Sequence, residues 1–520
     1  MKNIGNGLLA IFIVLFASVI LILSVRGLPG NPNAKEINNP LWKENGPFEL
    51  SPERGRFALL YSILEDKSFY FSIDLARFTV PDLGYKNGNY VSLFAPGVSF
   101  IAMPGYLIGK SLGSSQVGAF STVAIFSIFN LILVKLISKK LGASEISSWI
   151  AGLVFLFATP AYTYAVTLYQ HHISTFLILL ASYIVIKSKK LWPMFFVWLL
   201  CAASIPIDYP NLVLMLPIGV YAILLAFEIK SEKTKIRINL KLVGILTFLG
   251  VLIPTLFFTW FNTQSYGNPL QFSGTVGGVQ AIDTNGKPTA PETLNPKDTT
   301  VYKDPDDQVN SAVNFFKSRR LINGFYIQFI SPDRGIVVFT PVVLMSLVGI
   351  YLLHKKGNKY FVMFVGVLVA NVILYALWAD PWGGWAFGSR YLIPGYAVMA
   401  IFISIALTKY NRNIIFVVLF LASALYSIGV NTIGPITTDA VPPQVEALPL
   451  EKISGKQERY SYDRGWDLIK NGKSKSFIYQ TYAKDHLTTI QYYYVLSGAI
   501  GVATTALVVG NIFTKNHEKS

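Results

Sequence analysis

Long apolar runs separated by short polar loops dominate this chain from end to end. A helix crosses the core of a bilayer with about 20 consecutive apolar residues, and twelve stretches come close to that length. They are 7–25, 117–135, 147–165, 171–187, 191–207, 209–227, 242–262, 336–353, 360–378, 391–408, 414–430 and 491–512. The pattern predicts an all-α polytopic membrane protein with about twelve transmembrane helices.

The composition agrees with this prediction. Of the 520 residues, 52% are hydrophobic and only 14% are charged, and the mean hydropathy is +0.46. A soluble domain carries about 25% charged residues, so a single water-soluble globule is excluded. The lone cysteine, Cys201, lies in an apolar run, which leaves neither a disulfide framework nor a cysteine-based metal site.

Lysine and arginine are concentrated in the loops of one side. If the N-terminus is cytoplasmic, the inside segments hold 19 lysines and arginines and four acidic residues. The rest of the chain holds 25 basic and 24 acidic residues. These segments are 1–6, 135–146, 187–191, 228–241, 354–359, 409–413 and 513–520. Cytoplasmic loops are typically enriched in basic residues, so we expect both termini in the cytoplasm of a cell carrying this protein in its plasma membrane. The net charge of +16 then reflects membrane orientation, and no nucleic-acid partner is expected.

One further apolar run, 93–109, is not counted as a span. It contains Pro96 and Pro104, which we expect to interrupt a helix, and an extra span there would reverse the side of every later basic loop. The run is therefore predicted to be interfacial or re-entrant. It would lie on the outer face, as interfacial helical structure within the first outer loop.

Three long loops are predicted on the outer face, where any chemistry is expected, since the inner loops have only 5 to 14 residues. The first two, 26–116 and 263–334, belong to a transmembrane module over residues 1–430. Residues 431–520 then supply a third outer loop and the last transmembrane helix.

Acidic residues of the first outer loop are candidates for a general base. Glu53, Asp74 and Asp82 stand in helical or turn-forming contexts there, and a transferase needs a carboxylate to take the proton from an acceptor hydroxyl. The alternative for each is an ordinary solvated acid or a helix cap.

Residues at the outer ends of other stretches are candidates for binding substrate. His171 begins the fourth stretch and Asp208 lies in PIDYP, while Arg334 and Arg390 stand at the outer mouths of two later stretches. A guanidinium suits bidentate phosphate binding, with snorkelling toward head groups as the alternative. The glycine-rich run WADPWGGWAFGSRY adds Trp385 and Tyr391, for which an aromatic belt is the alternative.

Asp, Glu, Lys and Arg are absent from the interiors of the predicted spans. A proton- or ion-coupled transporter usually carries such groups near the midplane of the membrane. The pattern therefore favours a site at the outer interface.

Several short motifs recur in a recognisable order. SPERGRFALLYSILEDKSFYFSID is followed by PDLGYKNGNYVSLFAPGVSFIAMPGYLIG, and later come LYQHHISTFL, DYPNLVL, SYGNPL, ISPDRGIVVFTP and WGGWAFGSRYLIP. From about residue 47 to 400 the chain resembles polytopic GT-C-type glycosyltransferases, in particular the protein-mannosyltransferase-like group of bacteria and archaea.

The resemblance implies an enzyme that takes a sugar from a polyprenyl-phosphate-linked donor at the extracytoplasmic face. The acceptor would be a glycan, a lipid or a protein, and an acidic residue of the first loop would act as base. Asp82 and Glu53 flank the two best-matching loop pieces and are favoured over Asp74. Arg334, Arg390 and His171 would neutralise the leaving phosphate.

Two points stay open. A divalent metal is compatible with this chemistry, although the sequence has no firm metal signature. The main alternative function is a flippase for lipid-linked oligosaccharides, or another twelve-span transporter, and an inactive scaffold of cell-envelope assembly is a third.

Overall fold

Each of the twelve apolar stretches contains a helix. The computed structural model describes residues 2–43, 45–232, 235–290, 305 and 311–513, so parts of the predicted loop 263–334 and the tail 514–520 lie outside it. The helices are α1 (Lys2–Ser24), α5 (Ser115–Lys140), α6 (Glu145–Phe157), α8 (His171–Lys187), α9 (Met194–Ala203), α10 (Asn211–Ala226), α11 and α12 (Leu242–Thr247 and Leu252–Tyr266), α15 (Ser346–Lys355), α16 (Phe361–Ala376), α17 (Ile393–Lys409), α18 (Ile414–Ile436) and α21 (Thr489–Phe513).

Among the described residues, six helical segments are long and apolar enough to cross a membrane by length and composition. They are Gly5–Ser24, Ser115–Lys140, Leu242–Tyr266, Arg390–Lys409, Ile414–Ile436 and Thr489–Phe513. The other six stretches contain apolar helices of 10–17 residues. The helical membrane fold is thus confirmed, while the number of spans stays a prediction.

Two predicted stretches are broken by proline. The helix expected over 147–165 ends at Phe157, and after Pro160 a short helix, α7 (Ala161–Tyr164), follows. The stretch 336–353 begins with the single turn α14 (Ile336–Phe339), and Pro341 starts a 3-10 turn before α15. Proline lacks the N–H that would continue the ladder, so both breaks have a local cause.

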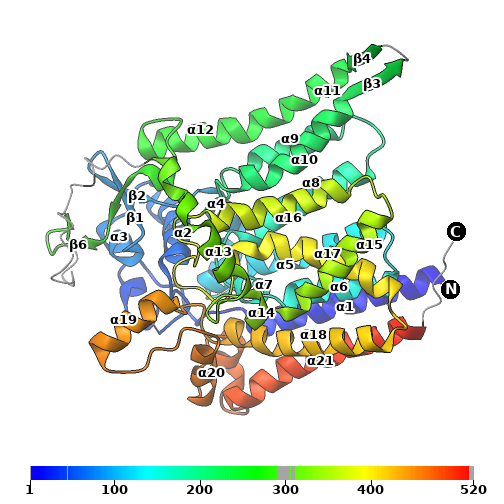
Figure 1. The fold of residues 1–520 in the computed structure, drawn as a ribbon. Helices are drawn as coiled ribbons and strands as arrows, with labels where there is room; N and C mark the ends of the chain where they lie inside the picture. The colour runs from blue at the N-terminus through cyan, green and yellow to red at the C-terminus, as the bar shows by residue number, and fades with distance from the viewer. Residues whose placement is uncertain (1, 44, 233–234, 291–304, 306–310, 514–520) are drawn as a thin grey trace.

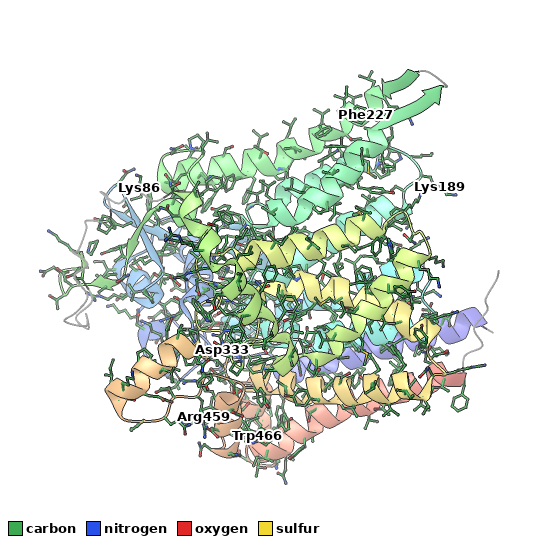
Figure 2. All side chains as sticks on the ribbon, viewed as in Figure 1. Lys86, Lys189, Phe227, Asp333, Arg459 and Trp466 are labelled. Atoms are coloured by element: carbon green, nitrogen blue, oxygen red, sulfur yellow. The ribbon has the colours of Figure 1, made fainter. Side chains whose placement is uncertain are left out.

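The bundle has two distinct ends (Figure 1). One end, here called the hairpin end, carries the antiparallel strands β3 (Phe227–Glu232) and β4 (Lys235–Leu240), together with the start of α1 and the end of α21. The opposite end, here called the loop end, carries the described parts of the predicted outer loops. Figure 2 places Lys189 and Phe227 at the hairpin end and Lys86 at the loop end. The structure therefore groups the loops as the charge pattern predicted, and the side that faces the cytoplasm stays a prediction.

Apolar side chains cover much of the outer surface of the bundle. On α1, Leu8, Ile11, Phe12, Leu15, Val19 and Ile22 are each more than half exposed, whereas Ile13, Ala17, Ile20 and Leu21 are buried. Their spacing puts the exposed and the buried residues on opposite faces of one helix. A face of this kind is stable in lipid and unfavourable in water, which agrees with a membrane environment.

The loop end is built on a short helix and a small sheet. Helix α2 (Ser51–Tyr61) precedes α3 (Ile73–Thr79), and β1 (Leu83–Lys86) pairs with β2 (Asn89–Ser92) and with β5 (Gly277–Val279), both antiparallel. The turn between β1 and β2 is Asn87-Gly88, and both residues have positive φ, as a tight hairpin turn requires. The all-α prediction missed this sheet although Asn-Gly is its sequence signal.

The remaining short elements complete the loop end and the later loops. They are α4 (Gly97–Ser111), α13 (Leu321–Phe329), α19 (Gln444–Ser454), α20 (Asp463–Lys470), β6 (Ala281–Ile282) and β7 (Pro288–Thr289).

Most of the run 93–109 lies in one helix, α4, which corrects the prediction that Pro104 interrupts it. Pro96 directly precedes α4, and Pro104 lies inside the helix. Close packing against α5 holds α4: a Cβ on Gly118 of α5 would lie 2.1 Å from the carbonyl oxygen of Gly105. In turn, Ser99 Oγ of α4 donates to the carbonyl of Arg56 in α2 at 2.8 Å. Contact between α4 and α5 thus supports the helix that carries Arg56.

We predict that Gly118→Ala lowers the stability of the folded protein by about 1–3 kcal/mol, because the added methyl forces two backbones apart. Thermal unfolding of the detergent-solubilised protein measures the effect. Gly498→Ala on α21 is the matched control, since a Cβ there meets no atom within 4 Å. Equal unfolding temperatures for both variants would contradict the packing described for α4 and α5.

Candidate functional site

Buried charged side chains gather at the loop end from several separate segments. Arg26 follows α1, Glu53 and Arg56 lie on α2, Asp208 precedes α10, Arg390 precedes α17, and Asp439 follows α18. All of these residues except Asp208 are less than a tenth exposed. They form two connected groups, one around Arg26 and one around Arg390.

Arg26 is fully buried and holds the first group together. Its Nη1 donates to Glu49 Oε2 at 3.1 Å and also to Asp439 Oδ1, and its Nη2 donates to the carbonyl of Gly434 at 2.8 Å. Burial opposes the charge, but the two carboxylates outweigh it and raise the pKa of Arg26. Burial by itself would raise the pKa of Asp439, whereas its pairing with Arg26 lowers that pKa. Arg26 and Asp439 therefore stay ionised at neutral pH.

Glu49 is satisfied by several donors besides Arg26. It receives Lys475 Nζ at 2.7 Å, Thr438 Oγ1 at 2.7 Å and the backbone N–H of Asp439 at 3.2 Å. A carboxylate with this many donors has its hydrogen-bonding capacity satisfied by the protein. Glu49 therefore belongs to the framework that holds the loops.

Glu53 differs from Glu49, because only one of its carboxylate oxygens has a hydrogen-bond partner among the described residues. At the start of α2 its Oε1 accepts the backbone N–H of Leu50 at 3.1 Å, which caps the helix. Its Oε2 is buried and has no hydrogen-bond partner among the described residues. Burial, and then the nearby charge of Asp439, raise the pKa of Glu53 well above that of an ordinary glutamate. An incompletely bonded carboxylate with a raised pKa is a typical proton acceptor.

Arg56 connects α2 to the second group. Its Nη1 donates to the carbonyl of Pro52 at 2.8 Å and its Nη2 to Gln170 Oε1 at 2.6 Å, while its guanidinium lies 4.7 Å from the ring centre of Phe94. Burial lowers the pKa of Arg56 to about 10, so the side chain remains a cation at neutral pH. Gln170 in turn donates a hydrogen bond to Asp208 Oδ2 at 3.1 Å.

Asp208 is partly exposed at the turn between α9 and α10. Burial raises its pKa in spite of the Gln170 hydrogen bond and the charges of Arg56 and Arg390. A carboxylate that accepts one amide and still reaches solvent can accept further hydroxyl groups.

Arg390 carries unused hydrogen-bond donors. Its guanidinium lies 5.1 Å from the ring centre of Tyr169 and 5.5 Å from that of Tyr391, and Tyr391 in turn stacks on Tyr375 at 4.3 Å. Both Nε and Nη1 are buried without a hydrogen-bond partner among the described residues. Leaving such donors unpaired costs about 1–3 kcal/mol each, and a bound anion would remove that cost.

His171 lies beside the same tyrosines. Its ring is parallel to that of Tyr169 at 5.9 Å and edge-on to Tyr391 at 6.3 Å, and its Nε2 has no partner within the described part of the chain. His172 is different, because its Nε2 lies 2.7 Å from the carbonyl oxygen of Ala161 and its other nitrogen faces Asn130. Of these two adjacent histidines, as the described residues surround them, His171 is the one with an unpartnered ring nitrogen.

Four residues predicted for the site lie outside these groups or are engaged by protein groups. Asp82 accepts Ser51 Oγ at 2.5 Å and so holds the start of α2. Asp74 lies in the first turn of α3. Trp385 Nε1 donates to Glu446 Oε2 at 2.7 Å, and its ring packs against the guanidinium of Arg464. Of the predicted set, the structure thus places His171, Asp208, Arg390 and Tyr391 in the group around Arg390, and Glu53 beside the group around Arg26.

Arg334, the fourth of these, is buried, and its guanidinium donates to backbone carbonyls. The acceptors are the carbonyl oxygens of Asp333, Trp382, Gly384 and Val441, at 2.9–3.0 Å. A guanidinium bonded in this way holds three loops together. Its contacts leave phosphate binding to Arg390.

Six residues of the two groups were not predicted from the sequence: Arg26, Glu49, Arg56, Tyr169, Gln170 and Asp439. Arg26 and Asp439 each stand just beyond an apolar stretch, which is the position at which an ionisable residue suggests a function. That signal is present in the sequence, but it gives no hint that the two residues pair across 413 positions.

A metal ion was left open by the sequence. Among the described residues, no group of three or more His, Cys, Asp or Glu side chains is arranged to hold a metal ion. The carboxylates around Arg26 are occupied by that guanidinium and by Lys475.

Comparisons with known proteins give weak structural similarity. No protein-family model and no curated protein matches the sequence. The crystal structure of apo ArnT from Cupriavidus metallidurans is similar with a TM-score of 0.44 and 11% identity, over 98% of this chain and 78% of ArnT. The crystal structure of ArnT bound to undecaprenyl phosphate is similar with a TM-score of 0.41 and 12% identity, over 98% of this chain and 77% of ArnT.

The archaeal oligosaccharyltransferase AglB from Archaeoglobus fulgidus, solved with an inhibitory peptide and a dolichol-phosphate, gives a TM-score of 0.38 and 13% identity. The match covers 95% of this chain and 56% of AglB. At such identities and TM-scores these similarities carry no weight for the function of this chain.

We predict that Arg26→Met destabilises the protein by roughly 3–5 kcal/mol, because it leaves Glu49 and Asp439 buried without their shared cation. Thermal unfolding in detergent measures the loss. Lys475→Met is the control: it removes a cation from Glu49 as well, but Arg26 still pairs with both carboxylates. A loss no larger than that of the control would contradict the central role of Arg26.

Proposed function

We propose that the chain is a membrane glycosyltransferase that moves a sugar from a polyprenyl-phosphate-linked donor to an acceptor at the loop end of the bundle. One observation carries the proposal. A buried carboxylate with an unused oxygen, Glu53, lies at the same end of the bundle as a buried guanidinium with unused donors, Arg390, and the charges of both act on Arg56 and Tyr169, which lie between the two groups. A transfer with a phosphate leaving group needs both, because one accepts the acceptor's proton and the other stabilises the departing anion.

The chemical step follows from these two groups. The acceptor O–H or N–H attacks the anomeric carbon of the donor sugar, and its proton passes to Glu53 Oε2. The bond between the anomeric carbon and the phosphate oxygen breaks, and the lipid phosphate departs with the bonding electrons. Arg390 donates to the phosphate oxygens, and Arg56 adds a second buried positive charge beside the ring of Tyr169.

The remaining groups are assigned by their free hydrogen-bonding capacity. His171 Nε2 has no partner among the described residues and lies near Tyr391, so we propose that it contacts the phosphate or the sugar. Asp208 can accept sugar hydroxyls, while Tyr169 and Tyr391 offer ring faces. Asp82, Arg334 and Trp385 are proposed to position the loops around the site, and Asp74 to start α3.

The orientation of this site relative to the cell is part of the proposal. The loop end carries the near-neutral predicted outer loops, and the hairpin end carries the basic ones. We propose that the loop end is extracytoplasmic and that the plasma membrane is the location. The mannosyltransferase-like group remains the suggested relationship, with the sugar unspecified.

We predict that Glu53→Gln lowers transfer by about 10²–10⁴-fold, because the amide keeps the shape of the side chain but cannot accept the proton. Membranes carrying each variant are assayed with a labelled polyprenyl-phosphate sugar. Asp74→Asn and Asp82→Asn serve as matched variants in the same loop, and we expect each to lose no more than about tenfold, since neither would take the proton. Full activity of Glu53→Gln would exclude Glu53 as the base.

The same assay separates the proposal from transport. A flippase would move the lipid-linked sugar across a vesicle membrane without forming a glycosylated product. Movement without product in the wild type would therefore favour the transporter.

The raised pKa of Glu53 predicts a pH dependence. The base acts when ionised, so transfer rises with pH through the pKa of Glu53, above the range of an ordinary glutamate. Asp439→Asn removes a negative charge that, after burial, raises this pKa, so the rising limb shifts to lower pH. We measure kcat/KM against pH, with Asp467→Asn, whose carboxylate pairs with exposed Arg459 at 3.0 Å, as the control. An unshifted limb in Asp439→Asn would show that another group titrates.

A further inference from the structure

An exposed basic segment lies just before α13. Lys317, Arg319 and Arg320 are exposed, and residues 311–332 contain no acidic residue. The ion pairs between described residues involve neither Lys317 nor Arg319. A concentrated positive charge of this kind attracts phosphate groups at a membrane surface.

The segment adjoins an exposed apolar surface. Ile322, Phe325, Tyr326 and Ile330, on α13 and at its end, are all exposed, and so are Val313 and Phe316 before it. The opposite face of α13 is buried, where a Cβ on Gly324 would lie 2.3 Å from the carbonyl oxygen of Ala376 in α16. A helix that turns apolar side chains outward beside basic residues is typical of the interface between lipid tails and head groups.

Backbone hydrogen bonds join this segment to the loop that leads to Arg390. The N–H of Lys317 donates to the carbonyl of Leu377 at 2.7 Å, and the N–H of Ala379 donates to the carbonyl of Phe315 at 2.7 Å. The guanidinium of Arg320 donates to the carbonyl of Ala379 and lies 5.6 Å from the ring centre of Trp382. The basic segment is therefore fixed to the polypeptide that ends at the site.

A row of aromatic rings follows the same route. Phe315 stacks on Trp378 with ring centres 5.4 Å apart, Trp378 lies 5.8 Å from Tyr375, and Tyr375 stacks on Tyr391. Tyr391 is a ring that supports the guanidinium of Arg390. The row thus runs from the exposed segment to the unused donors of the buried site.

We propose that Lys317, Arg319 and Arg320 collect the phosphate head group of the lipid-linked donor from the adjacent membrane leaflet, beside the aromatic row that leads to Arg390. This inference rests on the proposed function, since it names the route by which the donor enters. A lipid is favoured over a soluble phosphate because apolar side chains surround the cations. Entry from the side of the bundle also keeps the polyprenyl chain in the membrane throughout.

The test uses the full-length protein in detergent and radiolabelled undecaprenyl phosphate as the probe. The variant is Lys317→Gln with Arg319→Gln, which leaves Arg320 and its bond to Ala379 intact. We expect half-saturation at low ionic strength to need roughly 10- to 30-fold more lipid than in the wild type. High ionic strength should reduce this difference, because the lost attraction is between exposed charges.

The control removes two exposed lysines elsewhere, with Lys473→Gln and Lys484→Gln, and should bind as the wild type does. Arg390→Gln should weaken binding at low and at high ionic strength alike. Unchanged binding in the Lys317/Arg319 variant, or an equal loss in the lysine control, would overturn the entry route. Absence of binding to the wild type would overturn it too.

A transfer assay separates the two proposals. At saturating donor, kcat of the Lys317/Arg319 variant should equal that of the wild type, while KM for the donor rises. Normal transfer with an unchanged KM would refute the entry route and leave the glycosyltransferase proposal standing. Lipid binding that depends on Lys317 and Arg319, without any transfer by the wild type, would refute the enzyme alone.

Discussion

The buried guanidinium of Arg26 sets the arrangement of the loop end. A charge placed at the end of an apolar bundle is strongly destabilising unless carboxylates and carbonyls surround it. Arg26 meets this requirement with Glu49 of the first loop, Asp439 after α18 and the carbonyl of Gly434. The end of the first helix, the first loop and the end of α18 are thereby held together, and Glu53 is placed close to the charge of Asp439.

The buried polar side chains of the loop end differ in how completely the protein satisfies their hydrogen bonds. Arg26 and Arg334 donate hydrogen bonds to protein groups, and the ring of His172 is also hydrogen-bonded to the protein. Glu53, Arg390 and His171 each keep a buried polar atom without a partner among the described residues. Buried polar groups are almost always bonded in stable proteins, so the unpaired atoms of these three residues are candidates for contacts with a ligand.

Much of the architecture could be predicted because helix formation in a membrane is a local matter. A run of apolar residues must satisfy its own backbone there, so all twelve stretches contain helices, and Pro160 and Pro341 break two of them. The site was predicted only in part. His171, Asp208, Arg390 and Tyr391 could be named as candidates because they stand at the ends of apolar stretches. Asp82 and Arg334 were named as candidates too, but the structure bonds them to Ser51 and to backbone carbonyls.

The sequence by itself determined the helical class, the grouping of loops at two ends and a short set of acids and arginines from which a site could be built. Only the tertiary structure decided that Glu53, rather than Asp74 or Asp82, is buried with an unused oxygen, and that Arg26 and Asp439 form a pair. The reason is physical: apolarity acts over neighbouring residues, whereas burial and ion pairing depend on which distant segments pack together.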